Sequence, residues 1–297
     1  MAKTPLYLDQ VPINEAEIER LKNTFKNAYV SIYSEIQGAT DFGVANRSAI
    51  LSQIEVILTD LGVDVQQFLE DELPGVYAQG ADQAIRQLRN IGAPINVSEG
   101  FSRVHQDAIA ALVGDASRAF GESISGVNRS ANMLLGRVAR NLITQQIATS
   151  TISGEGLRNA RRQIKGILQE QGLEALTDKG GRKWSLDRYS EMLFRTKIVE
   201  ARNRGLVNRM VENDYDLVQV SRHQGTCDQC LPWEGKILSI TGKTKGYPTL
   251  EQAEREGLFH PNCRHAINAL IPSLANKTRA YDPNTKTLTP AGASIAN

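Results

Sequence analysis

Six cysteine and histidine residues gather in one short stretch of the sequence. All three cysteines and three of the four histidines lie between positions 223 and 265. Thiolate and imidazole are the ligands that zinc prefers, usually four of them in a tetrahedron. The stretch therefore predicts a metal centre with zinc as the cofactor. The candidates, in chain order, are His223, Cys227, Cys230, His260, Cys263 and His265.

The spacing of these candidates predicts two turns that each carry ligands. One turn is Cys227-x-x-Cys230, and the other is His260-Pro-Asn-Cys263-Arg-His265. Since zinc takes four ligands, we expect Cys227, Cys230, Cys263 and His265 to bind it. His260 is the main substitute, and His223 is the least favoured candidate. Buried thiols without any metal are the simpler alternative.

Other chemistries that use these residue types fit less well. A zinc deaminase needs a His-x-Glu motif, which the sequence lacks. A thioredoxin-like redox site needs a helix after its Cys-x-x-Cys, whereas Cys230 precedes Leu-Pro-Trp-Glu-Gly, a turn. A metal-dependent nuclease of the His-Asn-His kind remains the alternative function, because His260, Asn262 and His265 are suitable types. It would need one histidine free as a general base.

The residues around the two turns predict a small α+β module over residues 216–272. Residues 216–222 alternate as a strand does, and a second short strand follows Trp233. Thr249 and Gln252 have the capping-box spacing for a two-turn helix, which Gly257 can end. So short a segment has little core of its own, and zinc binding can contribute on the order of 10 kcal/mol to its folding.

The rest of the chain predicts a mainly α fold, with an elongated helical body at residues 14–171. Apolar residues recur there at spacings of three and four, from Ile18 onward. Pro74 and Gly75 are expected to break the helix predicted at residues 63–90. The expected helices span residues 14–38, 50–61, 63–90, 101–150 and 155–171. Residues 1–13 are expected to form an extended arm, 172–215 a hairpin and a basic helix, and 273–297 a polar tail.

Charge is unevenly distributed although the net charge is only +1. Residues 1–74 carry twelve acidic and five basic side chains, whereas residues 155–210 carry seven acidic and thirteen basic ones. A basic surface of this kind can bind phosphate without regard to sequence, so Arg158, Arg162 and Lys165 are candidate contacts to double-stranded DNA. Solvated helix faces explain the same charges more simply. No apolar run is long enough for a membrane span.

Residues 180–272 resemble the phage head morphogenesis, or minor head protein, family, which includes the Mu F-like minor capsid proteins. The likeness is strongest in the nonapeptide that ends in His265. Relatives of the Mu F type end that motif in cysteine, so the resemblance supports His265 as a ligand. The matching segments are Gly181-Arg-Lys-Trp-Ser-Leu186, Tyr189, Arg195-Thr196, Ser221-Arg-His223, Cys227-x-x-Cys230, Trp233-Glu-Gly-Lys236, Gly246-Tyr-Pro248 and Gly257-Leu-Phe-His-Pro-Asn-Cys-Arg-His265.

The resemblance implies a minor capsid protein without catalytic activity. Such a protein is made in the cytoplasm of the host bacterium and resides in the virion, inside the capsid near the portal. Its implied partners are the portal protein and other capsid proteins, with packaged DNA as a further candidate. Its implied role is head morphogenesis together with DNA packaging or delivery.

Overall fold

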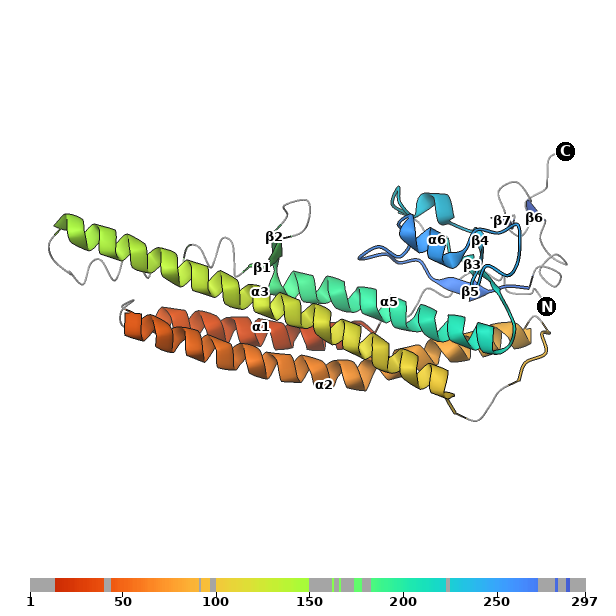
Figure 1. Ribbon diagram of the computed structural model, residues 1–297, viewed down its shortest axis with the longest axis horizontal. Helices are drawn as coiled ribbons and strands as arrows, with labels where there is room; N and C mark the ends of the chain where they lie inside the picture. Colours follow the sequence, from red (N-terminus) through yellow and green to blue (C-terminus); the bar gives the residue numbers. More distant parts are fainter. Residues whose placement is uncertain are drawn as a thin grey trace. The chain divides into compact units, whose positions relative to one another are not determined.

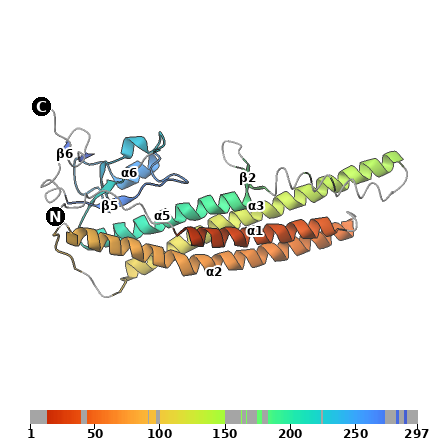
Figure 2. The ribbon, with the colours of Figure 1, turned by 180° about the vertical axis from the view of Figure 1, so that it is seen from behind.

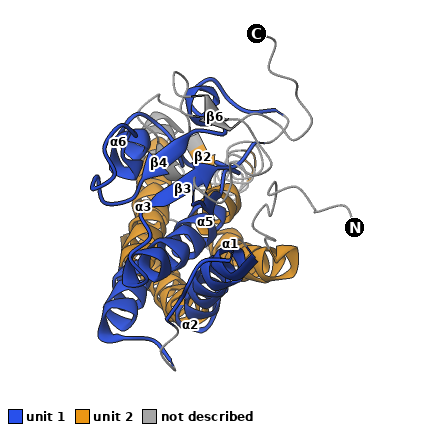
Figure 3. Cartoon of the chain, turned by 90° about the vertical axis from the view of Figure 1, so that its right-hand side faces the viewer, with its two compact units in different colours: residues 1–13, 70–114, 195–297 blue, residues 14–69, 115–194 orange. Residues whose placement is uncertain are grey.

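The structure is a computed structural model that is mainly helical and divides into two compact units (Figure 3). Unit 1 takes its described residues from Glu70–Gly114 and Arg195–Asn297, and unit 2 from Asn14–Leu69 and Asp115–Phe194. The predicted arm at residues 1–13, nearly all of the predicted helix 155–171, and His223 lie outside the described residues. The structure describes residues 14–39, 44–90, 92–96, 100–149, 162, 166, 174–177, 183–222, 225–271, 281–282 and 287–288.

Unit 2 is built from helices whose apolar faces pack together. Its elements are α1 (Glu15–Gly38), the first part of α2 (Val44–Asn90), the second part of α3 (Arg103–Thr149), and the start of α5 (Leu186–Glu212). The strands β1 (Glu174–Thr177) and β2 (Lys183–Ser185) pair antiparallel, which confirms the predicted hairpin. Phe25 stacks on Phe120 with ring centroids 5.8 Å apart, and Phe68 meets Phe194 edge-on at 4.9 Å. Aromatic contacts thus join α1 to α3 and α2 to α5.

Helix α2 runs without interruption through Pro74, so the predicted break at this position is wrong. Proline in a helix interior removes one backbone hydrogen bond and costs about 3 kcal/mol. Here Leu69, Leu73 and Tyr77 are buried on both sides of the proline. Burial of a large apolar side chain contributes about 1.5–3 kcal/mol each, which offsets that cost.

Unit 1 contains a close crossing of α2 and α5 at two glycines. A Cβ added at Gly80 would overlap the backbone carbonyl of Arg202, and one added at Gly205 would overlap that of Tyr77. The two backbones can therefore touch only because both residues lack a side chain.

His105, the one histidine outside the predicted cluster, lies in unit 1. The hydroxyl of Tyr77 lies 2.7 Å from its Nδ1.

The predicted module forms a sheet, one helix and two turns, in the expected order. The sheet has strand order β4-β3-β5 and is antiparallel, with β3 (Leu217–Val220) between β4 (Ile237–Ser239) and β5 (Ile267–Ala269). Helix α6 (Leu250–Arg255) begins as predicted, since the Thr249 hydroxyl accepts a hydrogen bond from the Gln252 amide at 3.0 Å. Figures 1 and 2 show the sheet and α6 beside the second half of α5.

The core of this module is larger than the sequence suggests, because helices contribute to it. One buried cluster joins Leu88 of α2 and Met210 of α5 to Val218 of the sheet and Trp233 of the first turn. Gln87 of α2 also binds the module, donating to the Asn268 side chain at 2.7 Å and accepting from the Ala269 amide at 2.8 Å. These contacts with α2 and α5 therefore stabilise the module without any metal.

A pair of short strands lies near the carboxyl end of the described residues. Within the predicted tail, β6 (Tyr281–Asp282) pairs antiparallel with β7 (Thr287–Leu288). Among the described residues, no helix has both the length and the hydropathy that crossing a bilayer requires.

Candidate metal centre

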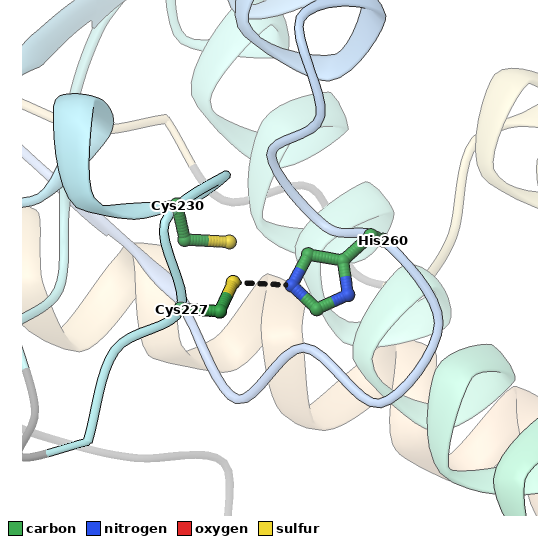
Figure 4. A group of neighbouring side chains, drawn as sticks. All are labelled: Cys227, Cys230 and His260. Carbon is green, nitrogen blue, oxygen red and sulfur yellow. Dashed lines mark hydrogen bonds between the residues drawn. The ribbon is translucent and has the colours of Figure 1, made fainter.

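The two predicted turns bring five candidate ligands together around Cys230. Cys227, Cys230 and His260 form one group and Cys230, Cys263 and His265 another, and within each group the ligand atoms lie within 4.8 Å of one another. Figure 4 shows Cys227 and Cys230 from one turn facing His260 from the other. Residues 33 positions apart in the sequence thus meet at one point.

Local backbone chemistry shapes each turn. In the first, the Cys230 and Leu231 amides both donate to the Cys227 carbonyl, at 3.1 and 2.9 Å, before the 3₁₀ turn η1 (Leu231–Trp233). In the second, the Cys263 amide donates to the His260 carbonyl at 2.9 Å. Asn262 has φ +65° there, a left-handed conformation that asparagine tolerates better than most residues. In each turn, these backbone hydrogen bonds fix the relative positions of two candidate ligands, Cys227 and Cys230 in the first and His260 and Cys263 in the second.

Two ligand-to-ligand distances in the second group are close to those of a zinc tetrahedron. Bond lengths to zinc imply edges of about 3.8 Å between two sulfurs and about 3.6 Å between sulfur and nitrogen. The Cys230 and Cys263 sulfurs are 3.6 Å apart, and the Cys263 sulfur is 3.4 Å from Nδ1 of His265. On these two edges, the three ligand atoms therefore match zinc to within about 0.2 Å.

His265 is oriented by a carboxylate on its far side. Its Nε2 lies 3.0 Å from Oε1 of Glu234, and the same oxygen accepts a hydrogen bond from the Thr226 hydroxyl. With the proton on Nε2, Nδ1 presents its lone pair to the thiols. A carboxylate behind a ligating histidine is a usual arrangement in zinc sites. Glu234 is therefore a supporting residue that the sequence reasoning missed.

His260 is placed differently from His265. Its Nδ1 lies 2.8 Å from the Pro261 carbonyl, which leaves Nε2 facing the Cys227 sulfur at 2.9 Å. That separation is too short for two corners of one zinc tetrahedron, whose edge would be about 3.6 Å. His260 and Cys227 therefore compete for one ligand position. His265 is buried, whereas His260 is half-buried.

The thiols respond to their surroundings in opposite ways. The Cys230 backbone amide holds the pKa of the exposed Cys227 thiol below its usual value, and the contact with His260 acts in the same direction. Burial raises the pKa of the Cys230 thiol, and the neighbouring Cys263 raises it further. A divalent cation favours thiolates, so binding would release protons from these buried sulfurs.

The other predicted site residues are the three candidate contacts to DNA. Arg162 is exposed, while Arg158 and Lys165 lie outside the described residues. Two arginines of the predicted basic helix are buried: Arg202 donates to Gln83 at 2.9 Å, and Arg209 pairs with Glu212 at 2.6 Å. These two side chains stabilise the fold and are not available to phosphate.

Comparisons with known proteins point to one family. Residues 36–291 match the family model described as "Phage minor capsid protein 2". A relative described as "Structural protein", from Lactococcus phage LL-H, is 24% identical over 174 residues. That match covers 54% of this chain and 46% of the relative, so the chain spans about half the length of that protein. No solved structure matches the chain.

Proposed function

The chain belongs to the phage minor capsid protein 2 family, and on this premise we propose that it is a non-catalytic component of the phage head that binds the portal inside the capsid. The family match over residues 36–291 is the observation that carries the proposal. Binding to the portal would let the chain assist head assembly and DNA packaging or delivery. The helices and the metal-braced module would supply rigid surfaces for contact with capsid proteins.

The proposal is tested in infected cells. An affinity-tagged chain should retain the portal protein of the same phage through purification, and trypsin should digest the chain only after heads are opened. If the tagged chain retains no head protein, or if trypsin removes it from intact heads, the proposed location is wrong.

Zinc is the proposed cofactor, with Cys227, Cys230, Cys263 and His265 as its ligands. The metal would fix the two turns and supply no reaction step. Chain purified without chelator should contain one zinc ion per molecule by mass spectrometry. Cys263→Ser and His265→Ala should lose it, while His260→Ala, on the competing histidine, should keep it. A metal-free wild-type chain would refute the assignment, and loss of zinc from His260→Ala would place His260, in place of Cys227, among the ligands.

The site geometry disfavours the alternative of a metal-dependent nuclease. Such an enzyme needs a histidine free to act as a base. Here Nε2 of His260 faces a thiol, and the two ring nitrogens of His265 face a thiol and a carboxylate. Purified chain with added divalent metal should leave supercoiled plasmid intact. Nicking that His260→Ala abolishes would establish the nuclease instead.

DNA contact is proposed for three basic residues of the 155–171 segment. Arg158, Arg162 and Lys165 would bind phosphate oxygens without regard to sequence. Gel shifts with duplex DNA should show binding that weakens as salt rises. The triple alanine variant should bind more weakly and with a shallower salt dependence. If wild type and variant bind equally at low salt, these residues do not contact DNA.

A further inference from the structure

A cleft of about 510 Å³ lies between α5 on one side and, on the other, α6 with the segment that joins it to the second ligand turn. Its apolar lining includes Val199 and Val207 of α5 and Leu250, Leu258 and Phe259 from the opposite side. All of these residues belong to unit 1. The volume suffices for one or two side chains of a bound peptide, and sites of this size commonly combine apolar walls with a few polar groups.

The rim of the cleft carries an excess of negative charge. Glu200, Glu251 and Glu254 line it together with one cation, Arg204. Glu200 is also paired with Lys197, whose Nζ lies 2.8 Å from its carboxylate. Among the described residues that line this rim or pair with it, the three carboxylates thus outnumber the two cations, Lys197 and Arg204.

Glu254 is the carboxylate of this rim whose pKa is shifted. Partial burial against the cleft wall raises its pKa; Arg204 opposes this shift, and Glu200 and Glu251 add to it. A cation brought into the cleft would stabilise the ionised carboxylate, because opposite charges within a few ångströms favour the charged form.

A buried amide on the cleft wall is a second and independent indication of a ligand. Asn203 lines the cleft and is only 9% exposed, yet its side-chain nitrogen makes no hydrogen bond within the described part of the chain. An unsatisfied buried donor costs about 1–3 kcal/mol. A backbone carbonyl of an extended peptide would supply the missing acceptor.

From these observations we infer that the cleft binds a peptide segment of a partner protein that presents one lysine or arginine between apolar residues. The basic side chain contacts Glu251 and Glu254, the apolar neighbours fill the space beside Val207 and Phe259, and the peptide backbone accepts from Asn203. The inference does not depend on the portal assignment, because it specifies the chemistry of the segment and not the protein that carries it.

The test uses the full chain and a fluorescein-labelled peptide of alternating leucine and arginine, followed by fluorescence anisotropy. A peptide of alternating leucine and glutamate is the negative control. The double variant Glu251→Gln/Glu254→Gln should weaken binding of the basic peptide by about tenfold or more. Glu256 lies just after α6, and Glu19 lies on α1; neither residue lines the cleft. The control variants Glu256→Gln and Glu19→Gln should therefore leave peptide binding unchanged.

The variant Asn203→Leu distinguishes a role of Asn203 in peptide binding from a role in the stability of the fold. Removing an unsatisfied buried amide should leave the unfolding midpoint unchanged or raised, while peptide binding weakens. The inference is refuted if the wild-type chain does not bind the basic peptide, if it binds the acidic peptide equally well, or if the variants inside and outside the cleft lose the same affinity.

Discussion

Replacing Gly205 with alanine tests the close crossing of α2 and α5, the two helices that contribute residues to the core of the module. The new Cβ would overlap the Tyr77 carbonyl oxygen and would lie 3.0 Å from the carbonyl carbon and 3.1 Å from the Ala81 amide nitrogen. All three atoms are backbone atoms within a helix, so no side-chain rotation can relieve the overlap. The two helices must separate by roughly 1 Å to restore ordinary contact distances.

Two opposing effects set the size of the change. Alanine is a better helix former than glycine by about 1 kcal/mol. Overpacking costs about 1–3 kcal/mol, and the upper end applies because the clash is with rigid backbone. The expected net effect is therefore a destabilisation of about 2 kcal/mol. Gly80, whose added Cβ would overlap the Arg202 carbonyl, should behave in the same way.

Gly75→Ala is the matched control, because Gly75 lies in the same helix and the same unit as Gly80 but has no atom within 4 Å of an added Cβ. It should gain most of the 1 kcal/mol from helix propensity. Urea unfolding followed by circular dichroism should therefore move the midpoints of Gly205→Ala and Gly75→Ala in opposite directions. If Gly205→Ala is as stable as Gly75→Ala, the helices do not approach each other as described.

Three further predictions concern the module. Glu234→Ala should weaken zinc binding about 10- to 100-fold in a chelator competition, because His265 loses the carboxylate that orients it; unchanged affinity would contradict this. Although burial raises the pKa of Asp216, hydrogen bonds from Ser239, Thr241 and Thr244 hold it well below its usual value. Its contribution to stability is thus present above pH about 4 and lost as the pH falls below that. In urea unfolding, the free energy of unfolding of Asp216→Asn should therefore decrease less steeply below pH about 4 than that of the wild type. Thr249→Ala should cost about 1 kcal/mol in urea unfolding through loss of the α6 cap, and a cost near zero would show that the cap is unimportant.

The elements that the sequence predicted correctly are those encoded by neighbouring residues. The stripe from Ile18 to Ile36 predicts α1, and Asn14 caps it by accepting from the Ala16 amide at 3.2 Å. The strand, turn and helix order of the module follows in the same way from alternation, glycine and a capping threonine. The convergence of the two ligand turns was also predictable, because cysteine and histidine at such spacing rarely serve another purpose.

What the sequence could not supply depends on contacts between distant segments. Pro74 is a strong local signal for a break, and only tertiary burial of Leu73 and Tyr77 overrides it. Glu234 is an ordinary acidic residue until folding brings it against His265, 31 positions away. Arg202 and Arg209 look like surface cations in a basic helix, and nothing nearby in the sequence says that they are buried.

The shared core also changes what the metal is expected to do. Cys230 and Cys263 belong to the same buried cluster as the α2 and α5 residues, so the helices hold these two sulfurs near each other independently of the ion. Loss of metal would therefore release mainly the outer parts of the turns, which carry Cys227 and His260. His260 and Cys263 line both the metal site and the peptide cleft. If zinc and the peptide both bind, thermodynamic linkage requires that zinc change the peptide affinity by the same factor by which the peptide changes the zinc affinity.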